Sequence, residues 1–295
     1  MSGLLTLAIE ALRHEVTLVT LEDAEVSVTR GIDHDSPLLA ALDSLGPDPE
    51  ERSLLISRWP EATRGLLIYG SRARGDYLPT SDFDLLRLAQ VPYPTFKVGR
   101  VSVSSYSPEQ LRSATRTLFG THLLRDAKII FDPTGDLAQI IATLQPATPG
   151  DLLRVVHHYS IVLDQPLDEQ LKHCAGLVRL ARYLLRTAVY AQALKGRTPC
   201  FSVRELAQRF NDPHLATLLA SDYNPTGPPT MAKLQELTER LRSIVGPPTQ
   251  NTFGSLAALA IAAWDSDRNL AALAIRAASE DEETLDYSDL PKVLL

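Results

Sequence analysis

A short apolar run that ends in Gly-Ser, with Asp-x-Asp after a ten-residue spacer, sets the fold of this chain more than any other segment. The run Leu66–Tyr69 predicts a buried strand that delivers Gly70 and Ser71 at its end. Asp82 and Asp84 then begin a second predicted strand, DFDLLRLAQ. Because alternate residues of a strand point to one face, both carboxylates aim the same way while the residue between them packs behind. The segment therefore predicts two strands joined by a turn, with polar groups gathered at one place.

The residue types in this segment suit the binding of phosphate and of a hard metal ion. Gly70 has no side chain, so a phosphate can approach the backbone, and the Ser71 hydroxyl can donate to phosphate oxygens. Arg72 and Arg74 follow directly and supply positive charge. Two convergent carboxylates repel each other unless a cation neutralises them. Mg²⁺ normally binds through one or two carboxylates plus substrate phosphates, so we expect the two aspartates to hold Mg²⁺.

The segment Gly70–Asp84 resembles the signature of the nucleotidyltransferase superfamily, the polymerase-beta-like fold, in which Gly-Ser and Asp-x-Asp are joined by a spacer. Its sequence pattern, RxRGDxxPxSDxDLL, is similar to that of the minimal and the aminoglycoside nucleotidyltransferases. The resemblance implies an enzyme that transfers a nucleoside monophosphate from ATP or another NTP to an acceptor hydroxyl. It implies that the NTP phosphates lie against Gly70 and Ser71, and that Asp82 and Asp84 are the catalytic Mg²⁺ ligands.

One departure from the superfamily pattern concerns a third carboxylate, which these enzymes usually place on the next strand. The expected strand, Gly99–Tyr106, carries Ser102 and Ser104 at its polar positions, and neither can bind a metal ion as an anion. The general base would then come from elsewhere, and Asp132 is a reserve candidate for a nearby carboxylate. The alternative is a catalytically degenerate relative that binds nucleotide in a regulatory or toxin–antitoxin role.

The pattern of the whole chain predicts an α+β fold, with a mixed-sheet nucleotidyltransferase domain followed by a C-terminal helical bundle. The segments VGRVSVSSYS and AKIIFDP read as two further strands, and SPEQLRSATRTLFGTHLLRD between them reads as a helix. The segment QPATPGD is a candidate boundary because it is rich in Pro and Gly. We expect an N-terminal helical extension at 1–59, the transferase domain at 60–146, the helical domain at 150–278 and an acidic tail at 279–295.

The helical half contains a basic stretch in an otherwise acidic protein. LKHCAGLVRLARYLLRTAVYAQALKG reads as one long helix, on which Arg179, Arg182 and Arg186 share a face. Arg182 and Arg186 are candidate ligands for the triphosphate, and the same face could bind an RNA backbone. The alternative interpretation is an ordinary solvated helix face.

Composition limits the partners and the compartment. The 295 residues carry a net charge of −7, which argues against a general nucleic-acid coat protein but allows a local basic site. We expect no membrane span and no signal peptide, and the two cysteines fit a reducing cytoplasm. The partners are an NTP and an acceptor, which is a small molecule, a protein or an RNA 3′ end. The oligomeric state, a homodimer included, stays open.

Overall fold

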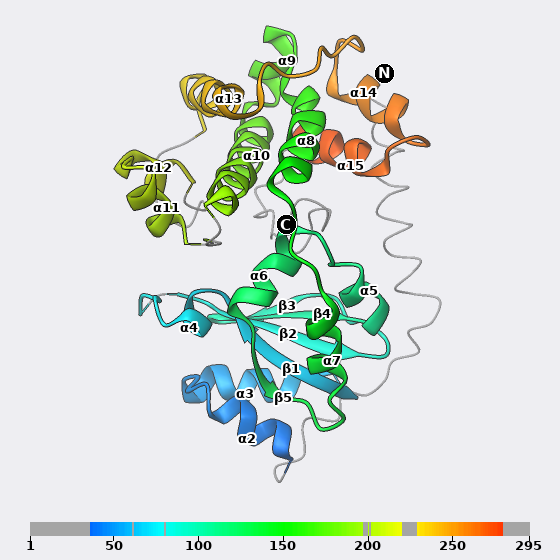
Figure 1. Cartoon of the computed structure of the whole chain (residues 1–295). Helices are drawn as coiled ribbons and strands as arrows, with labels where there is room; N and C mark the ends of the chain where they lie inside the picture. Colours follow the sequence, from blue (N-terminus) through cyan, green and yellow to red (C-terminus); the bar gives the residue numbers. More distant parts are fainter. Residues whose placement is uncertain are drawn as a thin grey trace.

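The computed structural model describes residues 36–60, 62–79, 81–196, 200, 202–219 and 229–279. The first 35 residues of the expected N-terminal helical extension lie outside the described residues. The same holds for all but the first residue of the acidic tail. In Figure 1 a sheet flanked by helices occupies one half of the molecule, and helices alone make up the other half.

Five strands form one mixed sheet in the order β3-β4-β2-β1-β5. The strands are β1 (Thr63–Tyr69), β2 (Phe83–Ala89), β3 (Phe96–Val98), β4 (Val101–Tyr106) and β5 (Lys128–Phe131). β2 and β4 pair in parallel, whereas the pairs β1–β2, β1–β5 and β3–β4 are antiparallel. The Gly-Ser motif at the end of β1 and the Asp-x-Asp motif at the start of the central strand β2 therefore adjoin each other.

Helices cover both faces of this sheet. One face packs on α2 (Pro37–Asp43) and α3 (Pro49–Arg58), and its core includes Trp59 and Phe83. The other face packs on α5 (Pro108–Arg112), α6 (Leu118–Asp126) and α7 (Asp136–Thr143). Figure 1 shows that this second face is turned toward the helical half. Side chains of the two faces alternate along β2, as its apolar run requires.

The helices before the sheet begin where their capping signals predict. α2 follows Ser36, whose side chain accepts a hydrogen bond from the backbone of Leu38, and Pro37 is its first residue. α3 follows Asp48, which forms a reciprocal capping box with Glu51. Both helices lie where the sequence analysis expects the N-terminal helical extension, and the second brings Glu51 against the sheet, where it is buried.

The helical half, residues 149–278, has one apolar core arranged around a long central helix. Its elements are α8 (Pro149–Tyr159), η1 (Ser160–Leu163), α9 (Leu167–Lys172), α10 (Cys174–Lys195), α11 (Val203–Arg209), α12 (Pro213–Leu219), α13 (Met231–Val245), α14 (Leu256–Ala263) and α15 (Arg268–Ala278). The predicted α+β class, a mixed sheet followed by helices, is confirmed. The division into domains near residues 146–150 stays a prediction. Within the described residues, none of the helices combines the length and the apolar character that a membrane crossing requires.

Three elements differ from the sequence prediction. VGRVSVSSYS is not one strand, because the chain turns at Gly99 and Arg100 between β3 and β4. The helix expected between β4 and β5 is two helices, and Arg116 lies between them with a positive φ of 60°. The long basic helix is likewise divided, with α9 ending at Lys172 and α10 beginning at Cys174.

Candidate active site at the ends of strands β1 and β2

The site is built on a row of residues that pair across four strands. Tyr69 of β1 pairs with Asp84 of β2, Asp84 pairs with Ser102 of β4, and Ser102 pairs with Lys97 of β3. Residues paired in a ladder project from the same face of a sheet. We call this row the aspartate rung. It lies on the face that is turned toward the helical half, as the arrangement in Figure 1 shows.

Asp82 lies two residues before Asp84, at the start of β2, and its position is fixed from behind by Phe83. The Phe83 ring is 3% exposed and packs in the opposite core with Val101. Alternation then directs Asp82 to the same face as Asp84, as the sequence predicted. Asp82 is half-exposed, and its Oδ2 lies 3.0 Å from the Lys97 Nζ.

Gly70 and Asp84 are in close contact. Gly70 is buried and begins the five-residue helix α4 (Gly70–Arg74) with a positive φ of 78°. A Cβ atom at this position would lie 2.6 Å from the Asp84 Oδ2, closer than real Cβ atoms approach. The backbone conformation therefore favours glycine here, and a Cβ atom would displace the Asp84 carboxylate from its present position. The structure thus brings Gly70, Ser71, Asp82 and Asp84 together.

Arg72 lies along the loop between the two motifs. Its guanidinium carbon is 3.7 Å from the centre of the Phe83 ring and 4.7 Å from that of Tyr77. Its Nε donates a hydrogen bond of 2.9 Å to the backbone oxygen of Ser81. These contacts fasten the spacer to β2, so that the start of the Asp-x-Asp strand is held against α4.

Arg74 points to α6 and enters a polar cluster. Its Nη1 donates to the Asp126 Oδ2 at 2.7 Å, and the His122 Nε2 lies 2.9 Å from the same oxygen. Burial favours the neutral forms, yet the hydrogen bonds from His122 and Arg74 lower the pKa of Asp126 below its usual value. Burial also lowers the pKa of His122, although Asp126 beside it acts in the opposite direction. Arg74 and Asp126 therefore form a charged pair that joins α4 to α6.

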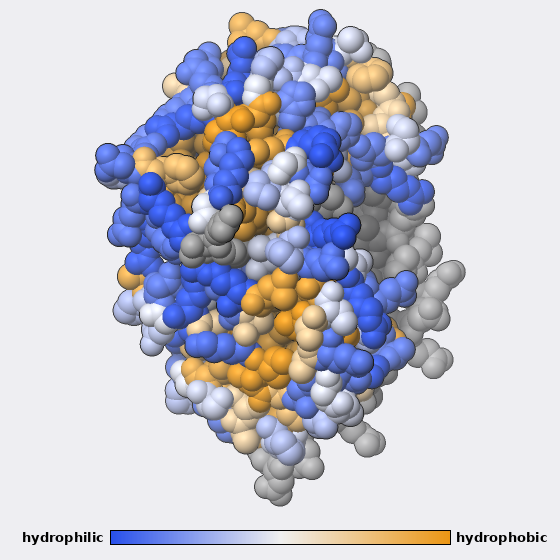
Figure 2. All heavy atoms as spheres, viewed as in Figure 1, coloured by the Kyte–Doolittle hydropathy of each residue, from blue (hydrophilic) through white to orange (hydrophobic). Residues whose placement is uncertain are grey.

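The helical half reaches the same region through α10 and α11. Arg204 of α11 donates a hydrogen bond of 2.8 Å to the backbone oxygen of Asp76, which belongs to the spacer loop. Arg125 of α6 lies 3.5 Å from Glu205 of α11. Figure 2 shows a mainly hydrophilic surface on the left of the view, over α4 and α11. The spacer loop is therefore held between β2 and the helical half.

The two arginines predicted on the long helix have different surroundings. Arg182 is buried in the helical half at 5% exposure, so the alternative interpretation of a solvated face is wrong at this position. Arg186 donates from its Nε to the Tyr190 hydroxyl at 2.8 Å. Burial is the largest cause of the lowered pKa of His122, Asp126 acts in the opposite direction, and the charges of Arg74 and Arg186 add to the lowering, which places Arg186 near the α6 cluster. Their predicted role in nucleotide binding stays a prediction.

Asp132, the reserve candidate, does not belong to this site. It follows β5 and accepts hydrogen bonds from the backbone of Leu137 and Ala138, so it caps α7. In the pairing with β1, Phe131 lies opposite Leu66, toward the end of β1 that is remote from Gly70. The interpretation of Asp132 as a nearby carboxylate is therefore wrong.

Three charged residues near the site were missed by the sequence analysis: Lys97, Arg100 and Asp126. Lys97 was missed because Pro92 and Pro94 obscure the short strand β3. Recognition of the β3–β4 hairpin would have placed Lys97 opposite Ser102. Asp126 had no sequence signal, because its partner Arg74 is 52 residues away.

The donor set fits a metal ion that is shared with substrate. In the described part of the chain, no three His, Cys, Asp or Glu side chains gather closely enough to bind a metal ion by themselves. The two aspartates and the Ser102 hydroxyl supply only hard oxygen ligands, the kind that Mg²⁺ prefers. Gly70 leaves the Asp84 carboxylate uncovered by a Cβ atom. These residues fit an Mg²⁺ ion whose remaining ligands are phosphate oxygens.

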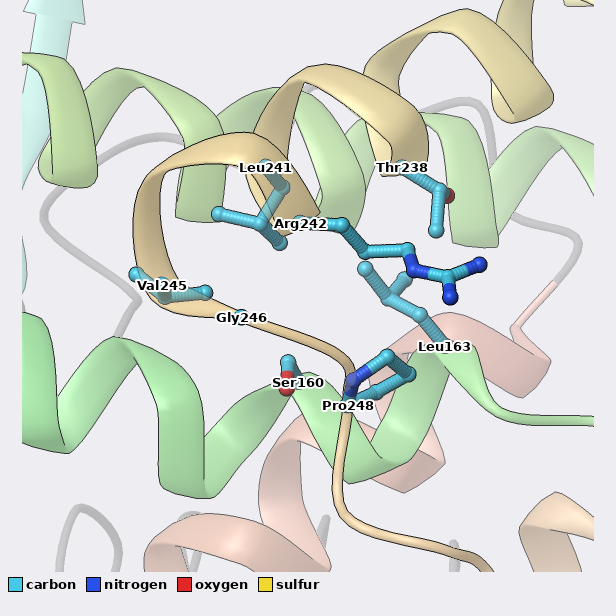
Figure 3. Close-up of a pocket in the computed structure, with 8 residues that line it drawn as sticks. All are labelled: Ser160, Leu163, Thr238, Leu241, Arg242, Val245, Gly246 and Pro248. Atoms are coloured by element: carbon cyan, nitrogen blue, oxygen red, sulfur yellow. The ribbon is translucent and has the colours of Figure 1, made fainter.

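A small crevice in the helical half is separate from this site. It is a small, partly open depression between η1, α13 and the turn that follows α13, and it encloses no space that a water molecule could fill. Figure 3 shows Leu163, Leu241 and Val245 around it, with the Arg242 side chain along one side. A ligand pocket usually encloses about 300–1,000 Å³, so this depression is too small to hold a ligand. The crevice therefore offers no competing site.

Replacing Arg72 with Lys should lower the free energy of unfolding by about 1 kcal/mol, because Lys keeps the charge but cannot stack flat on Phe83. Urea unfolding without nucleotide measures the effect. Arg58→Lys, at an exposed position on α3, is the control and should leave stability unchanged. An unchanged stability of the Arg72 variant would contradict a role in holding the spacer loop. A loss of NTP affinity of tenfold or more would show direct phosphate binding.

Comparison with known proteins gives a family for the sheet region. The family model described as nucleotidyltransferase domain matches residues 52–130, which include α4, the aspartate rung and α6. The search of curated proteins found no relative of this chain.

A solved structure similar to this chain is a nucleotidyltransferase-like protein from Exiguobacterium sibiricum 255-15. It is 15% identical, the match covers 74% of this chain and 80% of that protein, and the TM-score is 0.29. A likeness at this level says nothing about the activity. The family match and the geometry of Gly70, Asp82 and Asp84 agree with the motif-based prediction, and residues 52–130 belong to the nucleotidyltransferase superfamily.

Proposed function

We propose that this chain is a Mg²⁺-dependent nucleotidyltransferase that transfers a nucleoside monophosphate from an NTP to an acceptor hydroxyl. The observation that supports it best is the contact between Gly70 and Asp84. It sets the Gly-Ser turn beside both aspartates, on the sheet face turned toward the helical half. Phosphate binding by the turn and metal binding by the carboxylates would then occur at one place.

In this proposal the chain's own residues bind and orient the NTP. The turn at Gly70 receives the phosphates, and the Ser71 hydroxyl donates to a phosphate oxygen. Asp82 and Asp84 would hold Mg²⁺, which, when bound, neutralises the charge on the phosphates. The acceptor oxygen forms a bond to the α-phosphorus, and the bond to the bridging oxygen breaks. Pyrophosphate leaves with that electron pair, and the hydroxyl proton passes to a base or to water.

The acceptor would bind on the side of the helical half. Arg204 and Glu205 of α11 contact the spacer loop and α6, so α11 borders the aspartate side of the sheet. Ligand sites favour such junctions between structural units. A small molecule, a protein hydroxyl and an RNA 3′ end all remain candidates for the acceptor.

A second candidate function is nucleotide binding without transfer, in a regulatory or toxin–antitoxin role. Two observations favour it. Ser102 stands beside Asp84 where the superfamily usually has a third carboxylate, and Asp82 is paired with Lys97. A site with two acids and a lysine carries less negative charge for metal binding than a site with three acids.

Incubation with each NTP labelled on the α-phosphate, with Mg²⁺ and cell extract, tests the proposal. We expect release of pyrophosphate and label on one class of acceptor, which identifies that class as RNA, protein or small molecule. Omission of Mg²⁺ should abolish the transfer, and extract without the protein gives the background. NTP binding with neither label transfer nor pyrophosphate release would favour the second candidate.

A further inference from the structure

Lys97 is a basic residue that forms an ion pair with Asp82. Its Nζ lies 3.0 Å from the Asp82 Oδ2, and both side chains are about 40% exposed, at 41% and 44%. Lys97 comes from β3, the edge strand, whereas Asp82 precedes β2, two strands away. The Lys97 side chain therefore reaches across β4 to make this contact.

Ser102 makes that reach possible. It pairs with Lys97 on one side and with Asp84 on the other, so it lies between them on the aspartate rung. A serine is short enough for the four-carbon lysine stem to pass over it. An aspartate at position 102 would itself attract the Lys97 ammonium. The serine at position 102, in place of a third acid, and the ion pair between Lys97 and Asp82 therefore depend on each other.

The backbone that carries Lys97 is held in place by Glu51. Gly99 turns the chain between β3 and β4 with a positive φ of 53°. Glu51 accepts hydrogen bonds from the Arg100 backbone at 2.8 Å and from its Nη2 at 3.1 Å. The position of the Lys97 Cα relative to the aspartates is therefore fixed, while the exposed end of the side chain can move.

We propose that Lys97 is a phosphate ligand. Without nucleotide its ammonium group is paired with Asp82, and when a nucleotide binds, the ammonium group moves from Asp82 to an oxygen of the triphosphate. The inference rests on the proposed function, because it assigns a role toward the same NTP and metal ion. Exposed ion pairs are weak and exchange readily, so Asp82 can release Lys97. A triphosphate oxygen offers the ammonium a stronger, charge-assisted hydrogen bond. Asp82 then becomes available to Mg²⁺ at the moment when phosphate ligands are present.

Two binding measurements on Lys97→Met test the inference, and their expected changes have opposite signs. Without nucleotide, Mn²⁺ titrated under electron paramagnetic resonance should bind the variant about threefold to fivefold more tightly, because its competitor for Asp82 is gone. In EDTA, ATP titrated by calorimetry should bind the variant about tenfold more weakly, because a phosphate ligand is lost.

Two further variants serve as controls. Lys97→Arg keeps the positive charge and should match the parent protein in both titrations. Lys172→Met removes a lysine of comparable exposure that lies 3.9 Å from Glu169 on α9, and it should change neither titration. Melting temperatures of all variants verify that the fold is kept.

The outcomes separate this inference from the proposed function. Weaker Mn²⁺ binding by Lys97→Met, or ATP binding equal to the parent's, would overturn the role of Lys97 and leave the proposed function standing. A parent protein that binds neither Mn²⁺ nor ATP, even together, would contradict the proposed function and the inference with it. Opposite changes in the two affinities, reversed by Lys97→Arg, would support the inference.

Discussion

Asp84→Asn should reduce nucleotidyl transfer at least about 100-fold, as the loss of one charged group at a reaction centre commonly does. The amide keeps the shape of the carboxylate but carries no charge and turns one oxygen into a donor, so Mg²⁺ loses a ligand. Asp84 is only half-buried, and its neighbour Gly70 leaves room for a group of equal size, so the fold should be kept. Pyrophosphate release in the labelled-NTP assay measures the loss.

Two further variants are compared with Asp84→Asn, one at the second carboxylate and one as a control. Asp82→Asn should give a loss of the same order, because Asp82 supplies the other carboxylate. Asp265→Asn removes a charge from an exposed position in the helical half and should retain the parent's activity. Full transfer by Asp84→Asn, with an unchanged melting temperature, would refute its assignment as a metal ligand.

The part of the site that could be predicted from sequence is the part that local rules determine. Three of its features depend only on residues that are close together in the sequence: the buried strand, the Gly-Ser turn and the alternation of Asp82, Phe83 and Asp84. The capping residues Ser36 and Asp48 likewise fix the starts of two helices through contacts within one turn. For this reason the fold class and the superfamily were predicted and are confirmed.

The β3–β4 hairpin was not predicted, because Pro92 and Pro94 obscure β3 and the turn carries little local signal. Only Gly99 marks the turn, and its conformation is held by Glu51, which is far away in sequence. The break between α5 and α6 has a similar cause, since the backbone of Arg116 donates to the oxygen of Gln145 at 2.7 Å. Both breaks depend on contacts that a local pattern does not contain.

The partners of the charged residues were the least predictable feature. Arg72 and Arg74 have the spacing and charge of phosphate ligands, yet in the structure they contact Phe83 and Asp126. Their use depends on where β2 and α6 come to lie, which is a property of the tertiary fold. Lys97 was overlooked because its strand, β3, was not recognised, although it contacts a predicted metal ligand.

Glu51→Gln should lower the free energy of unfolding by about 3 kcal/mol at pH 7. Glu51 is 7% exposed and accepts hydrogen bonds from the backbone, Nε and Nη2 of Arg100. Burial raises the pKa of Glu51, but the hydrogen bonds from Arg100 outweigh it and lower the pKa from 4.5 to about 2. An amide would present a donor to the donors of Arg100 and would carry no charge.

The pH dependence of this loss identifies its cause. A carboxyl group with a lowered folded-state pKa stabilises the fold fully above its unfolded pKa of 4.5, and the stabilisation disappears as the pH falls through about 2. The difference between parent and Glu51→Gln should therefore shrink from about 3 kcal/mol at pH 7 to about 1 kcal/mol at pH 3, measured by urea unfolding. Glu50→Gln, at the exposed neighbouring position in the first turn of α3, should show a small difference at both pH values. A difference for Glu51→Gln that is equal at pH 7 and pH 3 would mean that packing, and not the charge on Glu51, holds the β3–β4 hairpin against α3.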